Sequence, residues 1–344
     1  MNTARLDLLN IGLMLGSLGL ASVFPYEVFL LSYIFLGPLH YLTEISWLHD
    51  RKNFCVHRVD ALLLVLPTLF IFLGWGAMIH VWHSPFFSAF MAEILVFTLL
   101  AALTFQSVRN VWIRMLSLLL VVGATVLYSK SPELLDWDLR YWLGLYLTTV
   151  IHVFVFTGIF ILLGALRNRS WTGLASLGVF VLAAATCFAN PLAGKAPAPL
   201  AWSREQFSIF APLNSGACHL LRLHRSDATG PLFPFHDLEE LYRSPAAFRV
   251  MTFIAFAYLY HYLNWFSKTR VIGWHRISRR RLLLILAAWV GSVGLYLWNF
   301  HVALFWLTIL SVSHVTLEFP LNWLSLKECA VRGGALVGLS RPRG

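Results

Sequence analysis

The chain has 344 residues, of which 58% are hydrophobic and 12% are charged, and its formal net charge is +10. Soluble domains carry about 25% charged residues, so this composition excludes an ordinary soluble protein. The basic residues stand in short clusters between apolar stretches, where they report membrane orientation, and nucleic-acid binding is not expected. The four cysteines form no CxxC pair, which argues against a zinc module or a disulfide framework.

Apolar stretches long enough to cross a bilayer recur along nearly the whole chain. In chain order we expect spans at 6–24, 27–47, 60–82, 86–106, 111–128, 141–165, 172–189, 247–267, 281–299 and 301–319. Runs such as 62–66 and 282–286 are apolar on every side, which favours helices over the alternating strands of a membrane barrel. The predicted fold class is therefore all-α, a polytopic transmembrane helical bundle of about ten spans. The first span lacks a small-residue cleavage site, which favours a retained helix over a signal peptide.

The charges of the connecting segments alternate along the chain. Lysines and arginines gather near 51–58, 109–114, 167–169, 268–281 and 327–343, whereas the acidic loop at 133–138 falls on the other side. Basic loops mark the cytoplasmic face, so we expect both termini inside a cell inner (plasma) membrane.

One long segment, 190–246, interrupts the run of spans. It begins with the Pro-rich stretch Pro191–Pro199 and is expected to be an extracytoplasmic cap over the bundle, with an interfacial helix at 237–242. A lid that controls substrate access is the alternative reading. The remainder predicts a single transmembrane helical domain over 1–330 and a cytoplasmic tail at 331–344.

Four of the thirteen histidines, His40, His152, His261 and His314, lie inside apolar spans. An ionisable side chain is expensive there and marks a candidate functional site. All four spans run from outside to inside, and each histidine lies roughly 11 to 14 residues from the outer end, so the four share one depth. Because imidazole suits iron, copper, zinc and nickel, this layer predicts a metal site with these histidines as ligands.

Three further polar residues accompany these histidines. Glu44 follows His40 by four residues and Glu318 follows His314 by four, a spacing that puts each carboxylate on its histidine's helix face. Each could orient an imidazole or ligate a second ion. Asn264 lies one helical turn beyond His261 and is a candidate polar partner for it.

The same histidines carry a resemblance to a known family. The segments Gly37–Glu44, Thr148–Phe154, Tyr258–Phe266 and Leu310–Phe319 resemble, in chain order, the four histidine motifs of the microbial membrane-bound β-carotene dioxygenases, the family of the bacteriorhodopsin-related protein and its homologues. The resemblance implies an all-helical bundle that holds one iron through histidines. It also implies that dioxygen is used to split a carotenoid at its central double bond into two retinals.

Two positions depart from the family's motifs. Trp265 stands where the third motif has a second histidine, and Thr157–Gly158 lie where an acid follows the second motif. The resemblance is therefore that of a distant relative with an altered substrate or chemistry.

The function hypothesis is iron (Fe²⁺)-dependent oxidation of a hydrophobic substrate, a carotenoid or a lipid, that enters laterally from the bilayer. Two alternatives of another class stay open. Paired histidines at one depth would also suit a haem b electron-transfer subunit, and the same residues could relay protons in a transporter. The HxxxH and HxxHH boxes of membrane desaturases are absent, as are GxGxxG and P-loop motifs.

Overall fold

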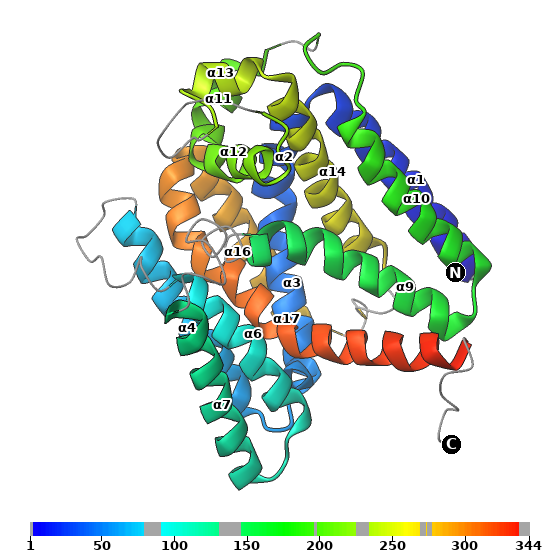
Figure 1. The fold of residues 1–344 in the computed structure, drawn as a ribbon, viewed down its shortest axis with the longest axis vertical. Helices are drawn as coiled ribbons and strands as arrows, with labels where there is room; N and C mark the ends of the chain where they lie inside the picture. Colours follow the sequence, from blue (N-terminus) through cyan, green and yellow to red (C-terminus); the bar gives the residue numbers. More distant parts are fainter. Residues whose placement is uncertain are drawn as a thin grey trace. The chain divides into compact units, whose positions relative to one another are not determined.

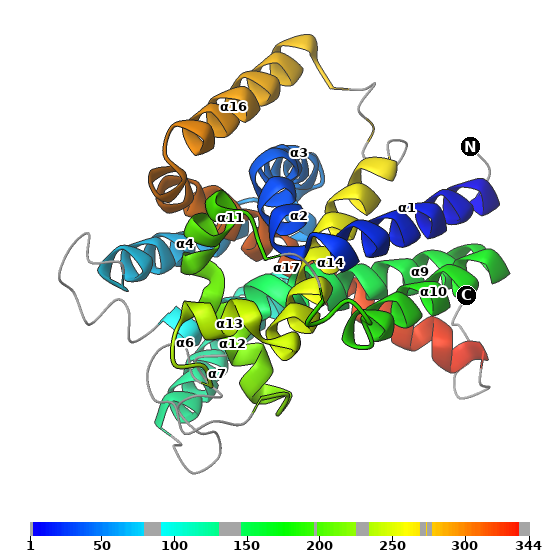
Figure 2. The same cartoon turned by 90° about the horizontal axis from the view of Figure 1, so that it is seen from above.

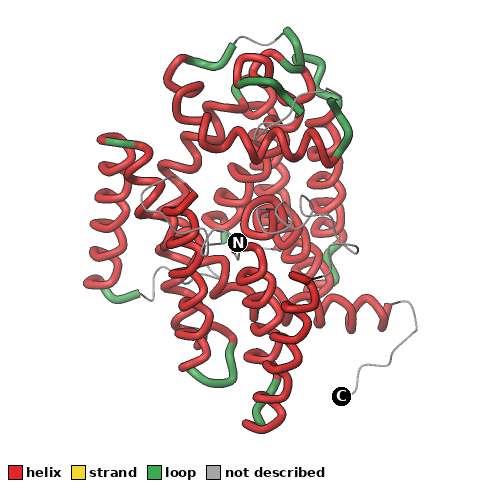
Figure 3. The backbone as a smooth tube through the Cα atoms, turned by 60° about the vertical axis from the view of Figure 1, so that its left-hand side comes forward, coloured by secondary structure: helices red, strands yellow, loops and turns green. Residues whose placement is uncertain are grey.

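The computed structural model describes residues 3–78, 91–130, 146–195, 198–224, 234–268, 273 and 277–336. Within these ranges every regular element is a helix and no strand occurs, and the tube of Figure 3 accordingly has red helices joined by green loops with no yellow segment. The predicted all-α class is therefore confirmed. The acidic loop at 133–138 and the tail beyond residue 336 lie outside the described residues.

The chain divides into two compact units, each assembled from segments that are distant in sequence. Unit 1 comprises Met1–Gly37 and Val153–Arg276, and unit 2 comprises Pro38–His152 and Ile277–Gly344. This division into compact units does not test the prediction of a single transmembrane helical domain over 1–330, which stays a prediction.

The helices of unit 1 are α1 (Thr3–Val23), α2 (Pro25–Leu31), the π-helix η1 (Ser32–Leu36), α9 (Thr157–Asn168), α10 (Trp171–Phe188), α11 (Ala201–Phe207), η4 (Ser208–Phe210), α12 (Ala211–Leu220), α13 (Leu238–Arg243) and α14 (Pro245–Ser267). Those of unit 2 are α3 (Gly37–Asp50), η2 (Lys52–Phe54), α4 (Val59–Met78), α6 (Met91–Ser107), α7 (Val111–Lys130), α16 (Arg279–Trp298) and α17 (Phe300–Leu336). The π-helix η3 (Leu147–Phe156) carries the chain from unit 2 into unit 1.

Six helical stretches are long and apolar enough to cross a membrane. They are Thr3–Val23, Pro25–Asp50, Leu147–Asn168, Trp171–Phe188, Arg279–Trp298 and Phe300–Gly334. Shorter apolar helices occupy Val59–Leu73, Glu93–Ser107 and Val111–Leu127, which overlap three of the other expected spans. The chain thus has the helices of a membrane protein, and the count of ten spans stays a prediction.

Unit 1 is organised around α14, whose side chains are mostly buried. This helix packs against α1, α2, α10 and α12, and α1 and α10 lie side by side (Figures 1 and 2). Side-chain hydrogen bonds also join α1 to the start of α10. The carboxylate of Asp7 on α1 accepts hydrogen bonds from Ser170 and Thr172 at the start of α10.

The segment predicted as a cap is itself helical where it is described. Helices α11, α12 and α13 gather at one end of α14 (Figure 1). The predicted helix at 237–242 appears as α13, and its N-cap Asp237 accepts a hydrogen bond from the backbone N–H of Glu240. Aromatic contacts attach this segment to α2, because Tyr26 on α2 packs edge to face against Phe207 and Tyr242.

Unit 2 is organised around α17, which packs against α4, α6 and α16. The indole N–H of Trp323 donates to the backbone carbonyl of Leu99 on α6 at 2.7 Å, and the hydroxyls of Thr316 and Thr68 on α4 lie 3.5 Å apart. The helix spans 37 residues with Pro320 inside it, so it extends well beyond the expected span at 301–319.

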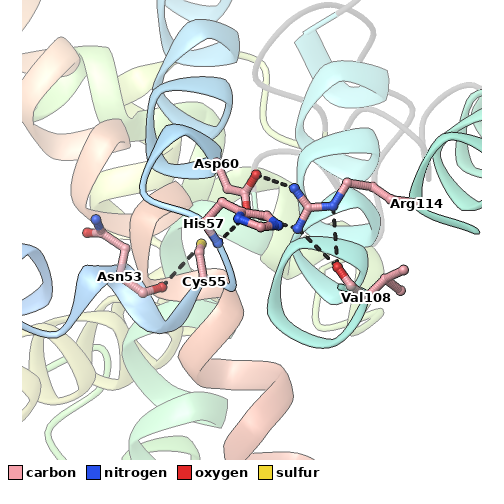
Figure 4. Close-up of polar contacts among 6 residues, drawn as sticks. All are labelled: Asn53, Cys55, His57, Asp60, Val108 and Arg114. Atoms are coloured by element: carbon pink, nitrogen blue, oxygen red, sulfur yellow. Dashed lines mark hydrogen bonds and ion pairs between the residues drawn. The ribbon is translucent and has the colours of Figure 1, made fainter. Parts of the chain in front are cut away.

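A buried ion pair closes one end of the α4, α6 and α7 group (Figure 4). The guanidinium of Arg114 on α7 donates to both carboxylate oxygens of Asp60 on α4, at 2.5 and 3.0 Å, and to the carbonyl of Val108. Asp60 is fully buried and also accepts from the backbone N–H of His57. The Arg114–Asp60 pair therefore joins the turn before α4 to the turn between α6 and α7.

Replacing Arg114 with alanine should lower the free energy of unfolding by about 3 kcal/mol, because the substitution leaves the buried Asp60 carboxylate without its cation. Thermal and denaturant unfolding of the purified protein in detergent measures the change. Arg109→Ala, at an exposed arginine of the same turn, is the control and should leave stability unchanged. Equal stability of the two variants would contradict the structural role of the pair.

Candidate metal centre

The first site histidine lies just after a change in helix type. Residues Ser32–Leu36 form a π-turn, and α3 follows from Gly37 with Pro38 in its first turn. Proline lacks an N–H and disturbs regular helical bonding at such a junction, and π-turns frequently accompany functional sites. His40 and Glu44 then share one face of α3, and the His40 Nε2 atom lies 3.1 Å from Glu44 Oε2 with both side chains buried.

The second histidine lies within a longer π-helix. His152 sits in η3, which extends over ten residues, and its side chain is buried. A π-helix closes its hydrogen bonds over five residues instead of four, so the side-chain positions rotate relative to a regular α-helix. His152 is therefore presented from a segment whose side-chain directions differ from those of a regular α-helix.

The third histidine comes from α17 and meets His152 directly. The Nε2 atoms of His314 and His152 lie 3.2 Å apart. The other ring nitrogen of His152, Nδ1, lies 3.0 Å from Glu318 Oε2. Glu318 therefore faces His152 from another segment of the chain, whereas the sequence suggested His314 on its own helix as the partner.

These side chains form a buried cluster of metal-ligating groups within unit 2. One donor atom each from His40, Glu44 and His314 all lie within 4.8 Å of one another. Two nitrogens bound at 2.0–2.1 Å to a tetrahedral ion would be about 3.3 Å apart, close to the separation between His152 and His314. The Tyr41 ring stacks on His314 at 4.2 Å between centroids and fixes its plane.

The charges of the cluster suit a divalent cation. Three neutral imidazoles and two carboxylates would neutralise a bound ion of charge +2, which is the state that an apolar environment tolerates. The contact of Glu318 with the far nitrogen of His152 is the arrangement by which proteins orient a ligating histidine. The cluster can therefore hold a metal ion.

The fourth predicted ligand, His261, belongs to unit 1. Its Nδ1 atom lies 2.8 Å from the hydroxyl of Thr157, and both side chains are buried. Asn264, the expected partner, is buried, and its side-chain oxygen has no hydrogen-bond partner among the described residues. The roles of His261 and Asn264 stay predictions.

Sequence reasoning did not assign roles to three residues that the structure singles out, namely Tyr41, Thr157 and Asn322. Tyr41 and Thr157 contact site histidines. Asn322 is buried one helical turn beyond Glu318. Asn322 could have been found from the sequence, because it repeats the four-residue spacing of His314 and Glu318. The contacts of Tyr41 and Thr157 could not, because they depend on how the helices pack.

Comparisons of the chain with protein-family models, curated proteins and solved structures find no match. The resemblance to the membrane-bound carotenoid dioxygenases is thus neither supported nor contradicted by them.

If Glu318 orients His152 toward a metal, Glu318→Gln should weaken metal affinity about 10- to 100-fold, since an amide cannot stabilise the ligating imidazole as a carboxylate does. Titration of the metal-free protein with Co²⁺, followed by its visible spectrum, measures the affinity. Glu328→Gln removes a carboxylate of the same helix that pairs with Arg332 and should bind Co²⁺ like wild type. Equal affinity of both variants would argue against the contact.

Proposed function

We propose that the protein is a membrane-embedded, iron-dependent oxygenase that acts on a hydrophobic substrate, with its metal centre in unit 2. The observation that carries the proposal is the convergence of His152 and His314, whose Nε2 atoms lie 3.2 Å apart while Glu318 faces the remaining nitrogen of His152.

The donor set supports iron. His40, His314 and Glu44 together supply two imidazoles and one carboxylate, the combination typical of non-haem Fe(II) oxygenases that keep open coordination positions. His152 adds a third imidazole beside this set. Iron, when bound, would supply the capacity to activate dioxygen.

The protein's own groups hold this site in one geometry. Glu318 orients the ring of His152, the stacked ring of Tyr41 orients His314, and burial of all five cluster residues restricts water. Such pre-positioning removes the cost of reorganising ligands during a reaction.

The apolar helices that carry the site histidines indicate the class of substrate. His152 and His314 lie in stretches long and apolar enough to span a membrane, as does His40 in Pro25–Asp50. A molecule dissolved in the bilayer can approach such helices laterally without crossing water. A polyene such as a carotenoid, or another lipid, fits this requirement and agrees with the resemblance of the four histidine motifs.

A haem between His152 and His314 is less well supported. Axial nitrogens on opposite sides of one iron, each at about 2.0 Å, would be about 4 Å apart. The two Nε2 atoms are closer than that.

We expect purified wild-type protein to contain iron in a fixed ratio to the chain and to show no Soret band. The His40→Ala, His314→Ala double variant should lose the iron, because it removes two of the three clustered imidazoles. Elemental analysis by inductively coupled plasma mass spectrometry and absorption spectra of the same samples test this. Oxygen consumption with added carotenoids and lipids then identifies the substrate.

The double variant His49→Ala, His301→Ala is the control, since both histidines are exposed. It should retain wild-type iron. A Soret band would overturn the non-haem proposal in favour of a haem protein. Carefully handled wild type without metal would favour a proton-coupled transporter.

A further inference from the structure

A row of polar side chains leads away from the metal cluster along one face of α17. After His314, polar residues follow at Glu318, Asn322, Ser325 and Cys329, with spacings of four, four, three and four residues. This spacing keeps all five on one face of a helix, over a length of about 22 Å. We call this row the α17 polar face.

Burial changes along the α17 polar face. Glu318, Asn322 and Ser325 are each at most 2% exposed, whereas Cys329 is partly exposed. Lys327 and the Glu328–Arg332 ion pair lie on the last turns of the helix, where charged side chains meet water. One end of the row therefore lies at the metal cluster, and the other lies among exposed charged side chains.

The environment of Asn322 indicates that a polar species binds on this row. Its side chain is 1% exposed, and neither its amide nitrogen nor its oxygen has a hydrogen-bond partner among the described residues. Leaving a buried amide unsatisfied costs about 1–3 kcal/mol, so such groups are normally met by water or by an ion. The neighbouring Trp323, by contrast, is satisfied by the carbonyl of Leu99.

We propose that the α17 polar face is the route by which a hydrated divalent cation reaches the metal cluster. The inference rests on the proposed function for the destination of the ion. A site buried among apolar helices needs an access route, because a bare ion cannot cross them. Oxygen donors spaced one turn apart allow a cation to exchange its waters stepwise.

Each step is ligand exchange without redox chemistry. At Ser325 and Asn322 the hydroxyl and the amide oxygen replace individual waters, which return toward the Cys329 end. At Glu318 the carboxylate attracts the cation beside His152, and the remaining waters are released as imidazole nitrogens bind.

Asn322→Leu keeps the volume of the side chain and removes its donor and acceptor. We expect this variant to take up Co²⁺ at least about tenfold more slowly than wild type, with the same final stoichiometry. Stopped-flow absorption of metal-free protein mixed with Co²⁺ measures the rate. Asn322→Gln retains an amide and should restore most of the rate, and Leu324→Ala, on another face of α17, should load like wild type.

Cysteine labelling gives a second readout that needs no metal. Asn322→Cys and Ser325→Cys should react with a small water-soluble methanethiosulfonate, whereas Leu317→Cys, at a buried apolar position of the same helix, should not. Cys187 and Cys329 are replaced beforehand. Burial raises the pKa of Cys55 and of Cys218 to about 12, so these two thiols stay largely unreactive.

The outcomes separate this inference from the proposed function. Wild-type loading rates in Asn322→Leu would overturn the route and leave the metal centre intact. A wild-type protein that binds no metal would overturn the proposed function. Labelling then decides whether the α17 polar face is hydrated. If neither Asn322→Cys nor Ser325→Cys is labelled, the route is overturned as well.

Discussion

The cost of burying ionisable side chains among apolar helices is the constraint on which unit 2 depends. His40, Glu44, His152, His314 and Glu318 are almost wholly shielded from solvent, and none of them can be stabilised there by bulk water. They are stabilised by one another, which requires η3 and α17 to approach within hydrogen-bonding distance. It also requires donor atoms of His40 and Glu44 on α3 to lie within 4.8 Å of a donor atom of His314. The cluster therefore restrains the packing of α3, η3 and α17 as much as it serves as a site.

Departures from regular helix geometry occur close to these residues. The π-turn η1 ends directly before α3, and η3 is a π-helix around His152. Pro320 lies inside α17, two residues beyond Glu318. Regular α-helices present side chains only at fixed rotations, so a local change of pitch is a direct way to aim a ring at a partner on another segment.

Much of the architecture could be read from composition and periodicity. Continuous apolar stretches predict helices, because a backbone in lipid must satisfy its own hydrogen bonds. The pairing of His40 with Glu44 could also be predicted, since residues four apart on a helix are neighbours whatever surrounds them. The extension of α17 to Leu336 and the division into two units depend on packing, which local periodicity does not encode.

The sequence by itself determined the helical class and the short list of buried ionisable residues, because apolar length and the four-residue repeat are local properties. Only the tertiary structure decided that Glu318 faces His152, that Thr157 meets His261 and that Tyr41 stacks on His314. Thr157 and His261, like Glu318 and His152, are separated by more than a hundred residues. Their contacts exist only once helices have packed at particular rotations, and many side-chain interactions act together to set those rotations.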